Sequence, residues 1–150
     1  MAAVSPTTAP QSETRPMETA QFVGWVAMVV GMFLAILDIQ IVASSLENIQ
    51  AGLSASPDEI GWVQTSYLIA EVVMIPLSGF LSRLMSTRWL FVISALGFTV
   101  MSVASACAWS IESMIWFRAL QGFLGGAMIP TVFATTYIIF PPDKRNAASV

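Results

Sequence analysis

Residues 22–46 read FVGWVAMVVGMFLAILDIQIVASSL, an apolar run in which Asp38 is the only charged residue. At about 1.5 Å per residue, a helix of this length crosses the roughly 30 Å hydrocarbon core of a bilayer. The run is longer than the apolar region of a secretory signal, and no basic cluster precedes it. These residues therefore predict a transmembrane helix that stays in the mature protein.

Three more apolar stretches follow after short polar connections. They cover about 61–82, with Glu71 as its only charge, 89–109, which has no charge, and 113–140, which contains Arg118 and Pro130. The last stretch is longer than the bilayer core, so we expect it to tilt, kink or project. The sequence thus predicts an all-α membrane protein with four transmembrane helices.

Composition supports this class and excludes several others. Apolar residues make up 56% of the chain and charged residues 10%, against roughly 45–50% and 25% in soluble domains. The chain has one Cys and no His, which excludes a disulfide, a Cys-based metal site and histidine chemistry. We expect no enzyme, no cofactor, no metal and, at a net charge of −3, no nucleic-acid partner.

Loop charges predict the orientation. Basic residues fall on one side of the four spans, at Arg15, Arg83, Arg88, Lys144 and Arg145. The opposite connections carry only acidic residues, at Glu47, Asp58, Glu59 and Glu112. The positive-inside rule therefore places both ends of the chain in the cytoplasm. Residues 1–21 lack an apolar period and are predicted to form a disordered cytoplasmic tail.

Three ionisable residues lie within the predicted spans and are candidates for function, because a charge in hydrocarbon is costly. Asp38 and Arg118 lie toward the external side of oppositely directed helices, where they could pair. A proton arriving at Asp38 would weaken that pair and so couple protonation to movement. The alternatives are a static ion pair or an arginine that extends toward the interface.

Glu71 lies near the middle of the second span. It could exchange protons or attract a cation; alternatively, it stays protonated and hydrogen-bonds to a neighbouring helix. Helical spacing puts Gln64 and Tyr67 on the same face, which indicates a cavity or a packing seam. Gly122 and Gly126 form a small-xxx-small pair for close helix packing. The third span, without an ionisable group, is expected to be a peripheral support.

The fourth stretch also contains the most specific motif. Residues 115–126 read IWFRALQGFLGG, which resembles the R-x-x-Q-G-x-x-G signature on the fourth helix of major facilitator transporters. Residues 37–42 read LDIQIV, similar to the L-D-x-T-I-V segment of the first helix in EmrB/QacA-type fourteen-helix drug:proton antiporters. The resemblance implies that Arg118 is the coupling arginine, that Asp38 is the first-helix carboxylate, and that Gln121 belongs to the same motif.

The resemblance covers residues 22–150, with further similarity at 62–67, 75–79 and 141–145. It implies the N-terminal part of a major facilitator bundle, truncated at the start of helix 5. Its cytoplasmic loop signature, G-x-L-x-D-x-x-G-R-[RK], reads GFLSRLMSTR at 79–88. Gly79 and Arg88 fit this signature, but Arg83 and Ser86 replace its acidic residue and second glycine. Near the end of helix 1, Gln40, Ala43 and Glu47 also depart from the family pattern.

The implied function is proton-coupled efflux of lipophilic, cationic drugs across the bacterial inner membrane. No nucleotide-binding loop is present in the sequence, so energy would come from the proton gradient. The implied partners are the lipid bilayer, protons, a small lipophilic substrate and the remaining helices of the parent transporter. Two alternatives stay open: a small four-helix exporter that works as a dimer, and a non-transporting membrane subunit or scaffold.

Overall fold

The computed structural model of the chain describes residues 19–140. Its elements are α1 (Thr19–Leu53), α2 (Pro57–Leu84), α3 (Thr87–Ala106), α4 (Ile111–Gly125) and α5 (Met128–Ile139). Within this part every element is a helix. Most of the predicted tail, the loop motif at 141–145 and the expected start of a fifth helix lie outside the described residues. Thr19 to Gln21, assigned to the tail by the sequence, form the first turn of α1.

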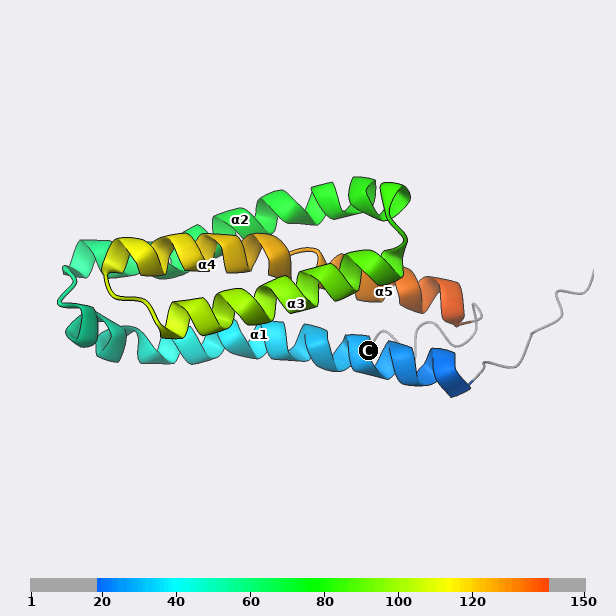
Figure 1. The fold of residues 1–150 in the computed structure, drawn as a ribbon, viewed down its shortest axis with the longest axis horizontal. Coiled ribbons are helices and arrows are strands. Elements are labelled where there is room, and N and C mark those ends of the chain that lie inside the picture. Colours follow the sequence, from blue (N-terminus) through cyan, green and yellow to red (C-terminus); the bar gives the residue numbers. More distant parts are fainter. Residues whose placement is uncertain (1–18, 141–150) are drawn as a thin grey trace, which may run out of the picture.

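The predicted all-helical membrane architecture is confirmed. α1, α2, α3 and the combined segment Ile111–Ile139 are each long and apolar enough to cross a membrane. α4 packs against α2 on one side and α3 on another, while α1 contacts α2 and α5 (Figure 1). The α1–α2 and α3–α4 connections lie at one end of the bundle, called here the α1–α2 end. The α2–α3 connection and the end of α5 lie at the other, the α2–α3 end (Figure 1).

The connection between α1 and α2 shows why both helices extend beyond the predicted 22–46 and 61–82. The last turns of α1 carry Ile49 and Leu53, which pack on the buried cluster that includes Ile60 and Met114. α2 begins with a capping box, in which Ser56 and Glu59 satisfy each other's backbone N–H groups. These residues lie in sequence that is too polar to count as a membrane span. Hydropathy alone therefore did not predict that α1 and α2 extend through them.

The fourth span is broken, as its length and its proline suggested. α4 ends at Gly125 and α5 starts at Met128. Pro130 has no backbone N–H to donate to the Gly126 carbonyl four residues earlier, and its ring collides with that carbonyl in a regular helix. The helix therefore ends before the proline and restarts, with the Thr131 N–H bonded to the Ala127 carbonyl at 3.3 Å.

α2 and α4 run in the same direction and touch backbone to backbone. A Cβ atom added to Gly126 would lie 2.7 Å from the Glu71 carbonyl oxygen, and one added to Gly122 would collide with the Tyr67 carbonyl. Small residues permit this approach because their side chains do not separate the helices. By contrast, α1 has a single buried residue, Ala35, and much of its apolar surface is exposed.

Candidate functional site

The centre of the bundle holds a partly buried ion pair between α1 and α4. Arg118 Nη1 lies 2.5 Å from Asp38 Oδ2, and the side chains are 1% and 23% exposed, respectively. Asp38 is thus the less enclosed partner, while the arginine is fully enclosed by helices. The pairing that was expected from the positions of these residues on oppositely directed helices is present in the structure.

Gln121 extends this pair to α3. Its side-chain oxygen accepts a 2.8 Å hydrogen bond from Arg118 Nη1, and its Nε2 donates to Ser102 Oγ at 2.6 Å. One amide therefore orients the guanidinium and is itself held by a hydroxyl on a third helix. The third span was expected to be a peripheral support, and that interpretation was wrong in this respect, because Ser102 belongs to the polar network.

The guanidinium of Arg118 also packs against the aromatic ring of Tyr67 on α2. Arg118 Cζ lies 4.3 Å from the ring centroid, and Tyr67 is completely buried. A cation over an aromatic face is attracted by the ring quadrupole, and the attraction is larger where water is excluded. The sequence placed Tyr67 on the correct face of α2 but did not indicate that its partner is Arg118.

Four buried side-chain atoms have no hydrogen-bond partner among the described residues, and two of them belong to Arg118. They are Arg118 Nε, Arg118 Nη2, Tyr67 Oη and Ser105 Oγ. Leaving a buried donor unsatisfied costs about 1–3 kcal/mol, and more for a charged group. Arginine carries its donors in a planar fork, so one whole edge of the Arg118 guanidinium is buried without an acceptor.

Glu71 lies one helical turn beyond Tyr67 on α2 and is partly buried. Its carboxylate forms no ion pair within residues 19–140, although it is close enough to Arg118 for an electrostatic interaction. Gln64, one turn before Tyr67, is also partly buried. The structure therefore brings Asp38, Tyr67 and Gln121 into direct contact with Arg118 and leaves Glu71 at the edge of this group.

The predicted loop motif lies far from this centre, at the α2–α3 end. Arg83 is in the last turn of α2, Arg88 follows the start of α3, and both are exposed. Gly79 has open space where a Cβ would stand. Ser86, which occupies the place of the family's second glycine, caps α3 by accepting a hydrogen bond from the Trp89 N–H at 3.5 Å.

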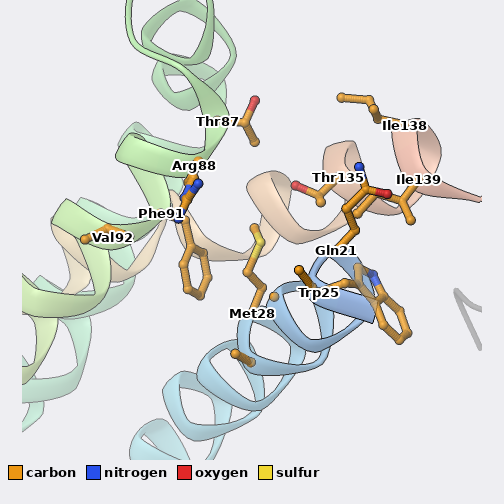
Figure 2. Close-up of a pocket in the computed structure, with 13 residues that line it drawn as sticks. Gln21, Trp25, Met28, Thr87, Arg88, Phe91, Val92, Thr135, Ile138 and Ile139 are labelled. Carbon is orange, nitrogen blue, oxygen red and sulfur yellow. The ribbon is translucent and has the colours of Figure 1, made fainter. Parts of the chain in front are cut away.

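An open pocket of about 660 Å³ lies near the same end, between α1, α3 and α5. Figure 2 shows Arg88 and Phe91 on one wall, with Met28 and Trp25 on α1 facing them. The pocket is lined mainly by apolar side chains and contains none of the intramembrane charges. We therefore place the candidate functional site at the Asp38–Arg118 pair. No cluster of three potential metal ligands occurs in the described residues.

Comparison with known proteins finds similar sequences. The family model of the Major Facilitator Superfamily matches residues 28–150. The colistin resistance protein EmrB of Acinetobacter baumannii is 53% identical over 131 residues, which is 87% of this chain and 25% of that protein. Multidrug resistance protein 3 of Bacillus subtilis is 34% identical over 122 residues, covering 81% of this chain and 24% of that protein.

The multidrug export protein EmrB of Escherichia coli K12 is 31% identical over 137 residues, or 91% of this chain and 27% of that protein. The chain thus spans about a quarter of the length of these curated relatives. The matched residues include Asp38, Glu71 and Arg118, so the candidate site lies within the similar region.

Proposed function

Because this chain belongs to the Major Facilitator Superfamily, we propose that it is the N-terminal helical segment of a transporter that exports lipophilic, cationic compounds in exchange for protons. The partly buried Asp38–Arg118 pair carries this proposal, since it offers a carboxylate whose charge a proton can cancel. The names of relatives, a colistin resistance protein and a multidrug export protein, support the substrate class.

The coupling follows from the energy of the pair. A buried arginine is stabilised by its carboxylate, and removing one partner of such a pair costs about 3–5 kcal/mol. When a proton neutralises Asp38, Arg118 loses that stabilisation within a site where little water reaches it. A bundle with a second arrangement that accommodates Arg118 better then changes conformation. Protonation of one carboxyl group thus drives the alternation of access.

We assign the N-terminus to the cytoplasm and the protein to the bacterial inner membrane. The exposed Arg83 and Arg88 at the α2–α3 end support this orientation, since basic residues concentrate in cytoplasmic connections. The lipid bilayer covers most of the exposed apolar surface. Part of the α1 surface contacts the remaining helices of the transporter, which together with this segment enclose the small lipophilic substrate.

Family membership contradicts the alternative of a small dimeric exporter of separate architecture. No contact in the described residues favours a scaffold without transport activity. The proposal predicts that membranes containing the full-length transporter export a lipophilic cationic dye when a proton gradient is imposed.

The test compares dye efflux from vesicles that contain the parent protein, Asp38→Asn or Arg118→Ala. Both variants should lose proton-driven export, because neither retains a pair that a proton can open. Glu47→Gln is the matched control, since Glu47 is an exposed carboxylate on the same helix as Asp38. If both variants export dye at the parental rate with the parental pH dependence, the coupling assignment is wrong.

A further inference from the structure

The guanidinium of Arg118 uses only part of its binding capacity. Nη1 donates to both Asp38 and Gln121. Nε and Nη2, on the other edge, are buried without a partner among the described residues. Two adjacent N–H groups of this kind match the two oxygens of a carboxylate. The arginine therefore presents an unused bidentate edge inside the bundle.

The carboxylate of Glu71 has two oxygens that match the two unpartnered donors of Arg118. Glu71 lies four residues after Tyr67, whose ring contacts the guanidinium, and positions four apart share a helix face. Helical side chains lean toward the N-terminus of their own helix, which directs the Glu71 carboxyl group back toward Tyr67. The other acidic residues of the described region besides Asp38 lie near the α1–α2 end, at Glu47, Asp58, Glu59 and Glu112.

Arg118 and Glu71 start about two helical turns apart. The Glu71 backbone lies beside Gly126, eight residues along α4 from Arg118, which corresponds to about 12 Å. The guanidinium already extends in that direction, because it reaches Gln121 and lies on the Tyr67 ring.

We propose that Arg118 is shared between two carboxylates, pairing with Asp38 in the conformation described here and with Glu71 once Asp38 carries a proton. This inference rests on the proposed proton-coupled function. In the first state Asp38 is ionised and Glu71 is neutral. In the second state, an incoming proton binds to the Asp38 carboxylate. Glu71 releases its own proton and accepts hydrogen bonds from Arg118 Nε and Nη2.

The exchange balances both protons and charge. One proton binds and one leaves, and Asp38, Glu71 and Arg118 together carry no net charge in either state. The arginine is therefore never left as an uncompensated buried charge, the state that costs most in hydrocarbon. Among the elements packed around it, α5 carries no acidic or basic residue and α3 carries only Arg88, at the α2–α3 end. From α3, Ser102 reaches this group through Gln121.

The direction of the exchange fits transport. Asp38 lies level with Arg118, whereas Glu71 lies beside Gly126, further toward the α2–α3 end. A proton that enters at Asp38 is thus matched by one that leaves closer to the other side of the membrane. Glu71 becomes the site of proton release, and Asp38 the site of proton entry.

Labelling of Glu71 by a lipophilic carbodiimide tests the exchange in the full-length transporter in membranes, because this reagent modifies protonated carboxyl groups. Mass spectrometry of the α2 peptide measures the modified fraction. Asp38→Asn mimics the protonated aspartate, so labelling of Glu71 should fall several-fold from the parental value. In Asp38→Asn combined with Arg118→Gln, labelling should recover. Glu47→Gln should leave it unchanged.

Equal labelling of Glu71 in the parent and in Asp38→Asn would overturn the proposal, as would failure of Asp38→Asn to fold when the combined variant folds. Melting in detergent provides a second measurement. Asp38→Asn with Glu71→Gln leaves Arg118 without a carboxylate, so its melting temperature should fall by more than the two single losses combined; additive losses contradict sharing. None of these readouts requires transport, so absent dye export would overturn only the proposed function.

Discussion

Arg118 is buried to an extent that is unusual for an arginine, and each of its contacts comes from a different helix. Asp38 approaches from α1, Tyr67 from α2, and Gln121 links it to Ser102 on α3. A charged side chain that is held in this way stays in one orientation, which a coupling group requires. The amide of Gln121 is central to that orientation because it hydrogen-bonds to both the guanidinium and Ser102 of α3.

Replacing Gln121 tests this role. Gln121→Leu removes the acceptor of Arg118 Nη1 and leaves Ser102 Oγ without its donor, so we expect a loss of about 1–3 kcal/mol in the free energy of unfolding. Ser102→Ala should cost less, about 0.6 kcal/mol, the average for a hydrogen bond between helices in membranes. Thermal unfolding in detergent measures both.

Thr99→Ala is the control on the same helix, since the Thr99 hydroxyl is exposed and bonds only to Ala95 of its own helix. An unchanged melting temperature for Gln121→Leu would contradict the role of the amide. A loss in Thr99→Ala as large as that in Ser102→Ala would show that α3 responds to any lost hydroxyl.

Sequence reasoning could predict the Asp38–Arg118 pair but not its neighbours. Two opposite charges in hydrocarbon on oppositely directed helices have a strong reason to meet. Serines such as Ser102 and Ser105, in contrast, are common in transmembrane helices, and hydropathy gives no information about which of them faces a charge. Their partners depend on the relative rotation and register of α3 and α4, which packing determines.

The α2–α4 contact is the tightest helix contact in the described region, and glycines permit it. Gly122 and Gly126 place the α4 backbone directly against the backbone of Tyr67 and Glu71. The small-xxx-small spacing predicted close packing of α4, but it could not identify α2 as the partner. The Pro130 break is similar: the proline predicted an interruption, and the structure locates it at Gly126 and Ala127.

A methyl group at Gly122 should separate these helices. Gly122→Ala places a Cβ against the Tyr67 carbonyl, which is backbone and cannot move aside without shifting α2. Overpacking of this kind costs about 1–3 kcal/mol, and it should also displace Tyr67 from beneath Arg118. Gly79→Ala is the matched control, because a Cβ there meets nothing within 4 Å.

The measurement is again the melting temperature in detergent, together with dye export from vesicles. Gly122→Ala should lower both, and Gly79→Ala should change neither. Equal stability of the two variants would mean that α2 and α4 tolerate a wider separation than the structure indicates.

The described part of the molecule is a helical bundle with a largely apolar outer surface. Large hydrophobic residues are exposed on all four candidate spans, as expected where lipid or further protein replaces water. Hydropathy predicted these spans because the bilayer requires long apolar helices. It missed the ends, where capping by Ser56 and packing of Ile49 and Leu53 extend the helices.

The proposed orientation can be tested with single cysteines. In a Cys107→Ala background, Ser54→Cys lies in the connection at the α1–α2 end and Met85→Cys in that at the α2–α3 end. A membrane-impermeant maleimide applied to spheroplasts should label Ser54→Cys directly, and Met85→Cys only after permeabilisation. The reverse pattern would invert the proposed topology and place the N-terminus outside the cytoplasm.

The contrast between α1 and the α2–α4 pair has a mechanical consequence. The backbones of α2 and α4 are in contact at two successive helical turns, at Gly122 and Gly126. We therefore expect these two helices to move together as one rigid unit. α1 packs against α2 and α5 with one buried residue. Within residues 19–140, its polar side-chain contacts with the later helices are the Trp25–Thr136 hydrogen bond and the ion pair of Asp38. Neutralising Asp38 therefore weakens the attachment of α1 near its middle, while the α2–α4 unit keeps its structure. Relative movement of the helices is then expected between α1 and the helices against which it packs.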